Sequence, residues 1–127
     1  MKRFMVFLVF CITLTSCGNA CDTGEYYTIV SPLLQEWDDA TSVAHRTSRI
    51  ALPGTLSNLQ AIKRRTERLK IPECFEDAHS FLIKSMYYTI EGFLAFAGDA
   101  DDIKVRQKFS LAQTSTETWL LKLKSAK

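Results

Sequence analysis

IPECFEDAHSFLIKSMYYTIEGFLAFAG, residues 71–98, is the most strongly patterned stretch of this chain. Its mainly apolar inner positions recur every three or four residues, which is the period of an α-helix. These positions are Phe75, His79, Leu82, Met86, Ile90 and Phe93. Ile83, Tyr87 and Leu94 widen the stripe, which predicts that this helix is the most buried one. Pro72 suits the first turn of such a helix and Gly98 suits its end.

Three further segments have the same period on either side of this stretch. Their stripes run through Tyr26, Val30, Leu33, Trp37, Ala40 and Ala44, through Leu56, Leu59, Ile62, Thr66 and Leu69, and through Val105, Phe109, Ala112, Thr116, Trp119 and Leu123. No alternating strand pattern competes with them. Because the connections are short, consecutive helices should be antiparallel neighbours. The sequence therefore predicts an all-α protein, an up-down-up-down antiparallel four-helix bundle.

Several residues indicate where these helices begin and end. The Leu-Pro-Gly sequence at residues 52–54 predicts a turn before the second helix. Pro32 has no backbone N–H, so it either kinks the first helix or lies in its first turn. Asp99, Asp101 and Asp102 precede the fourth helix and are candidate N-terminal caps.

The first residues of the chain have the order of an export signal. Lys2 and Arg3 precede an almost uninterrupted apolar run over residues 4–14. This run is too short to span a bilayer, which takes about 20 apolar residues. The run ends in Leu14-Thr15-Ser16-Cys17, which resembles the lipobox of bacterial lipoproteins.

The lipobox resemblance implies a lipid anchor. In that family the cysteine, here Cys17, receives a diacylglyceryl group, and the leader is cut just before it. Residues 1–16 are then the signal peptide, 17–24 the lipidated cysteine with a short tether, and 25–127 the bundle domain. Gly18 follows the cysteine, which by analogy favours the outer membrane in a bacterium with two membranes and the outer surface in one with a single membrane.

Ordinary secretion is the alternative interpretation of the leader. Gly18-Asn19-Ala20 is a small-residue sequence that a signal peptidase can cut before Cys21. The product would be a soluble exported protein without an acyl chain. Either product has about 110 residues, which is the size of one domain.

The cysteines fit an oxidising compartment. Cys11 lies in the leader and Cys17 in the lipobox, which leaves Cys21 and Cys74 as a pair. Alternation of helix direction puts the start of the first helix and the start of the third at the same end of the bundle. We therefore expect a Cys21–Cys74 disulfide, with two free thiols as the alternative.

The charge balance gives no reason to expect nucleic acid as a partner. The chain has 16 basic and 14 acidic residues, and removal of the leader makes the two numbers equal. One basic cluster stands out, formed by Lys63, Arg64, Arg65 and Arg68. It is interpreted either as a contact for anionic lipid headgroups beside the anchor or as a solvated helix face.

One motif has the spacing of a metal site. Glu76 and His79 form an E-x-x-H, but the carboxylate-bridged bundles that use it need a second such motif and two more carboxylates. The only other histidine is His45, which lacks that context. His79 is better explained as a core side chain that hydrogen-bonds a neighbour. We predict no catalytic residue, metal or cofactor, and no enzyme activity.

The body of the chain resembles a group of small, uncharacterised, helical exported bacterial lipoproteins. The resemblance rests on PLLQEW at residues 32–37, IPEC at 71–74 and IEGFLAF at 90–96. It implies a bundle in an exported setting and carries no catalytic residues. We expect a lipid-anchored binding or structural module of the cell envelope, whose partners are the membrane and an unknown envelope protein or small ligand. A small metal-binding protein or enzyme using Glu76 and His79, and a carrier with a ligand groove between aromatic-rich helices, are the alternatives.

Overall fold

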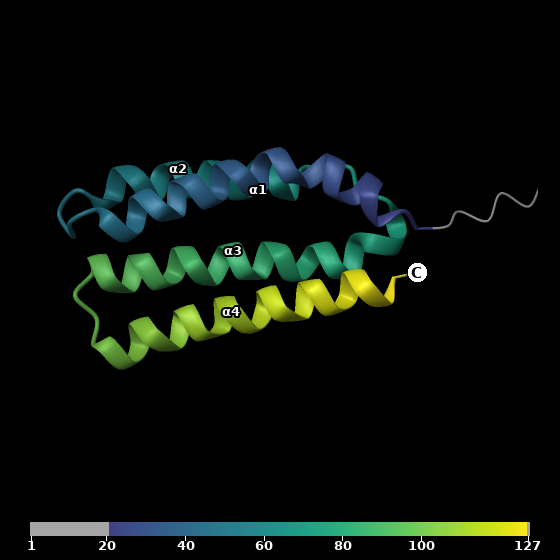
Figure 1. Cartoon of the computed structure of the whole chain (residues 1–127). Helices are drawn as coiled ribbons and strands as arrows, with labels where there is room; N and C mark the ends of the chain where they lie inside the picture. The colour runs from purple at the N-terminus through teal and green to yellow at the C-terminus, as the bar shows by residue number, and fades with distance from the viewer. Residues whose placement is uncertain (1–20, 127) are drawn as a thin grey trace, which may run out of the picture.

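A computed structural model describes residues 21–126 and consists of four long helices within that range (Figure 1). The helices are α1 (Thr23–Arg46), α2 (Leu52–Glu67), α3 (Glu76–Ala97) and α4 (Asp102–Ser125), and a 3-10 turn η1 (Glu73–Phe75) precedes α3. No strand occurs in the part of the chain described. The predicted all-α four-helix bundle is confirmed.

Consecutive helices run in opposite directions, with α1 beside α2 and α3 beside α4 (Figure 1). At one end, which we call the disulfide end, α1 and α3 begin and α2 and α4 finish. The other end carries the α1–α2 and α3–α4 connections, and we call it the loop end. None of the helices within residues 21–126 is long and apolar enough to cross a membrane.

The core consists of two clusters of buried side chains. The cluster towards the loop end takes its fully buried members from α1, α2 and α3. The cluster at the disulfide end is built from α1, η1, α3 and α4, and includes Tyr26, Phe75 and Trp119. Helix α4 contributes its two large buried side chains, Trp119 and Leu123, to the cluster at the disulfide end.

The boundaries of α1 and α2 differ in part from those that the sequence suggests. Asp22 caps α1 by accepting a hydrogen bond from the Gly24 amide at 2.8 Å, so the helix begins well before Pro32 and continues through it. Of the two interpretations of this proline, a start of the helix is therefore wrong. The predicted turn at residues 52–54 is also wrong, because α2 begins at Leu52. A proline in the first turn of a helix loses no intrahelical hydrogen bond.

Helix α3 buries the most side chains of the four described helices, as predicted. Its wider stripe is only partly covered, however, because Tyr87 remains 46% exposed and Leu94 42% exposed. The expectation that both belong to the inner face is therefore wrong. The period identifies apolar positions, but the neighbouring helices do not extend over this flank of α3.

The connection between α3 and α4 is short and specific. Gly98 caps α3, and Asp99 takes the left-handed conformation with φ 58°. Asp101 caps α4 through a 2.8 Å hydrogen bond from the Lys104 amide. Of the three predicted caps, Asp101 therefore holds the position, while Asp99 forms an ion pair with Arg49 of the α1–α2 connection.

Candidate functional site

A buried chain of hydrogen bonds joins all four helices in the disulfide half of the bundle. The indole Nε1–H of Trp119 (α4) lies 3.1 Å from the hydroxyl oxygen of Tyr26 (α1). That hydroxyl lies 3.1 Å from Nδ1 of His79 (α3), and Nε2 of the same ring lies 3.1 Å from the backbone carbonyl of Thr66 (α2). Each of the four residues is at most 7% exposed.

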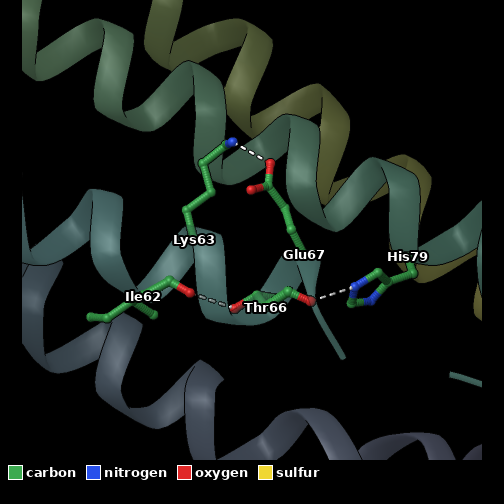
Figure 2. A network of polar contacts seen from close by, with 5 residues as sticks. All are labelled: Ile62, Lys63, Thr66, Glu67 and His79. Carbon is green, nitrogen blue, oxygen red and sulfur yellow. Dashed lines mark hydrogen bonds and ion pairs between the residues drawn. The ribbon is translucent and has the colours of Figure 1, made fainter. Parts of the chain in front are cut away.

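Only one arrangement of protons gives every donor and acceptor in this hydrogen-bond chain a partner. The Thr66 carbonyl can only accept, so Nε2 of His79 carries a proton and donates it (Figure 2). In a neutral imidazole Nδ1 is then an acceptor, and the Tyr26 hydroxyl donates to it. The Tyr26 oxygen in turn accepts from Trp119. The direction of donation is therefore fixed from α4 through α1 and α3 to α2.

The pKa shifts agree with this neutral arrangement. Burial lowers the pKa of His79 below its ordinary value, with an opposing contribution from the hydrogen bond to Thr66. Burial also raises the pKa of Tyr26 to about 12. Both ring nitrogens of His79 are occupied, so the chain stabilises the bundle and offers no free acid or base.

The E-x-x-H motif is not assembled into a metal site. His79 is buried, whereas Glu76 is exposed to solvent at the start of α3. His45 lies near the end of α1, far along the bundle, where its ring contacts Phe93. Within residues 21–126 no three histidine, cysteine or carboxylate side chains gather where they could hold a metal ion.

The predicted headgroup contacts are partly used inside the protein. Lys63 pairs with Glu67 one turn later on α2, as Figure 2 shows. Arg65 pairs with Glu36 of α1 through its two terminal guanidinium nitrogens, and this hydrogen bonding raises the Arg65 pKa. The remaining members of the cluster are Arg64 and Arg68, which are exposed and form no ion pair with other described residues.

The structure places Cys21 and Cys74 at disulfide distance, with their Cα atoms 6.3 Å apart. The bond attaches the start of α1 to η1, where the ring of Phe75 lies 5.1 Å from that of Tyr26. The covalent link and the buried hydrogen-bond chain therefore support the same end of the bundle. Cys17, the predicted lipidation site, lies outside the described residues.

A surface hollow with a volume of about 720 Å³ lies beside this disulfide. Charged side chains of both signs line it, among them Asp22, Glu25, Lys70 and Glu73. Such a mixed lining selects no single class of ligand.

A smaller, more apolar cleft lies at the loop end, and the sequence analysis did not identify it. The cleft has a volume of about 250 Å³ and lies between the end of α1, the end of α3 and the start of α4. Its lining residues are Ala44, His45, Thr47, Phe93, Phe96, Val105 and Phe109. The only sequence signal is that three phenylalanines fall near helix ends that the antiparallel topology brings together.

Comparisons with protein families, with curated proteins and with solved structures gave no match to this chain.

Proposed function

We propose that this protein is a lipid-anchored binding or structural module of a bacterial cell envelope, attached through an acylated Cys17. The leader supports this proposal through its charge, its apolar run and the lipobox at residues 14–17. Two or three acyl chains, at about 0.8 kcal/mol for each buried CH₂ group, hold a protein on a membrane almost permanently.

The Cys21–Cys74 disulfide is the structural observation that carries the proposal. Disulfides of small domains persist in oxidising compartments and are rare in the reducing cytosol, so this bond supports export. The bond also lies only four residues after Cys17. An anchor on that cysteine would therefore hold the bundle by its disulfide end and leave the loop end free for a partner.

A role for lipid headgroups is a minor part of the proposal. Arg64 and Arg68 lie one turn apart near the end of α2 and have no carboxylate partner among the described residues, so each can contribute about 1 kcal/mol at an anionic surface. Lys63 and Arg65 contribute less because each already has a carboxylate partner.

The decisive experiment is the intact mass of the full-length gene product isolated from its native membrane fraction. The expected mass begins at Cys17, includes the acyl chains, and rises by about two daltons on reduction because the disulfide gains two hydrogens. An unacylated mass that begins at Cys21 would instead establish ordinary secretion.

Two cysteine variants make this experiment specific. Cys17→Ser should abolish acylation and leave the leader attached. Cys11→Ser removes the other leader cysteine and should have no effect on either step. Acylation that survives in Cys17→Ser would refute the proposed anchor.

A further inference from the structure

The two ends of the bundle differ in how α1 meets α4. At the disulfide end, Trp119 of α4 bonds the hydroxyl of Tyr26, and the Tyr27 ring lies 6.5 Å from the indole. At the loop end no described hydrogen bond or ion pair joins the two helices, and the 250 Å³ cleft lies there instead. The opening is therefore confined to the loop end, whereas a buried hydrogen bond joins α1 and α4 at the disulfide end.

Aromatic rings pack against one another in the wall of this cleft. The rings of Phe93 and Phe109 meet edge to face at 5.2 Å, and the His45 ring lies 4.9 Å from Phe93. Phe109 lies against α3 because residue 92 is glycine, where a β-carbon would come within 2.8 Å of the ring. The three rings therefore contact one another in the wall of the cleft.

The size and walls of the cleft suit a single aromatic ring. Ligand pockets for larger molecules span about 300–1,000 Å³, whereas apolar cavities of about 150 Å³ are large enough for benzene. Ring edges and faces in the wall favour an inserted aromatic ring over an aliphatic group, since edge-to-face pairs add about 0.5–1.5 kcal/mol.

Arg49 supplies a positively charged group beside the cleft, next to the lining residue Phe96. The guanidinium of Arg49 lies over the Phe96 ring, 4.9 Å from its centre, and pairs with Asp99. A guanidinium has five N–H donors, so one carboxylate partner leaves donors for a second. His45 also lines the cleft, is exposed, and adds a further polar side chain.

We propose that the loop-end cleft binds a small aromatic carboxylate, with its ring among Phe93, Phe96 and Phe109 and its carboxylate near Arg49. This gives the binding role proposed above a location and a ligand class. It rests on that role but not on the lipid anchor, so a negative result for acylation would leave it standing.

The test is a ¹⁹F NMR titration of 4-fluorophenylacetate with the full-length protein as recovered from cells, its disulfide intact. Saturable binding is expected. Val105→Phe fills the cleft and should weaken binding by at least about tenfold, which corresponds to about 1.4 kcal/mol. Leu121→Phe, on an exposed position of the same helix, is the matched control and should bind like the parent protein. Absence of saturable binding, or equal binding by Val105→Phe, would overturn the proposal.

Two further measurements keep the test independent of folding and of charge. Thr47→Leu fills the cleft from the residue that follows α1 and should also weaken binding, so a folding defect in one variant does not decide the result. Circular dichroism checks that each variant is folded.

4-Fluorobenzylamine has a similar shape and the opposite charge, and it should bind more weakly than the acid. Arg49→Gln should remove that difference, and an amine that binds as tightly as the acid to the parent protein would overturn the assignment of a carboxylate.

Discussion

The hydroxyl group of Tyr26 lies 3.1 Å from Nδ1 of His79, although the two residues are 53 positions apart in the chain. This contact joins α1 to α3 and is the middle link between Trp119 and the carbonyl of Thr66. Every donor in this hydrogen-bond chain has one acceptor, so loss of the Tyr26 hydroxyl leaves the Trp119 N–H and His79 Nδ1 without partners. A buried polar group without a partner lowers the free energy of unfolding by more than a satisfied hydrogen bond raises it.

Replacing Tyr26 by phenylalanine should therefore destabilise the bundle by about 2 kcal/mol, since the Trp119 N–H and His79 Nδ1 both lose a partner in a buried site. Urea unfolding followed by circular dichroism measures the loss. Tyr27→Phe is the matched control, because Tyr27 is 39% exposed. It should change stability by less than about 0.5 kcal/mol. Equal effects of the two substitutions would show that the hydrogen-bond chain does not contribute to the stability of the bundle.

Stability should fall as the pH is lowered below about 6.5, the ordinary pKa of histidine. Burial lowers the pKa of His79 in the folded state, so the unfolded state binds the proton more readily, and the loss reaches at most about 1.4 kcal/mol per pH unit. His79→Gln still offers a donor to Thr66 but does not titrate, so this part of the decline should disappear. His45→Gln should retain it. A decline that is unchanged in His79→Gln would assign the effect to other groups.

Gly92→Ala should destabilise the protein by about 1–3 kcal/mol through overpacking, because its β-carbon would lie 2.8 Å from the ring of Phe109. Gly54→Ala is a suitable comparison, since nothing lies within 4 Å of its β-carbon. This second substitution should leave stability unchanged or raise it by up to about 1 kcal/mol. Thermal unfolding of both variants checks the difference, and a neutral Gly92→Ala would mean that the ring can move away freely.

Reduction of the Cys21–Cys74 disulfide should lower the free energy of unfolding by about 4 kcal/mol, given a sequence separation of 53 residues. Urea unfolding with and without a dithiol measures the change. The double variant Cys21→Ala/Cys74→Ala should show the same loss and no further response to the dithiol. A response that persists in this variant would point to another cysteine.

The sequence predicted the four helices because each one needs only a local, repeating pattern of apolar residues. Its errors at residues 52–54 and at Tyr87 have different origins. A proline near the start of a helix fits either a non-helical turn before the helix or the first turn of the helix itself. The period of apolar residues in one helix does not say how far a neighbouring helix extends over it.

The candidate sites were harder to predict because they depend on how the helices align with one another. His79 was correctly expected in the core with a hydrogen-bonding neighbour. The sequence around His79 does not indicate that Tyr26 and Trp119 belong to the same hydrogen-bond chain. The loop-end cleft depends in the same way on Phe93 and Phe109, which lie on different helices and meet only through the packing of α3 on α4.

The placement of both described chain ends at the disulfide end has a practical consequence. Figure 1 shows the end of α4 beside the start of α1, at the end of the bundle away from the α1–α2 and α3–α4 connections. A protein coupled to a sensor surface through its C-terminus would therefore present its loop end to the solution. A chain held at Cys17 would present the same end, so immobilised protein can reproduce the orientation of an anchored one.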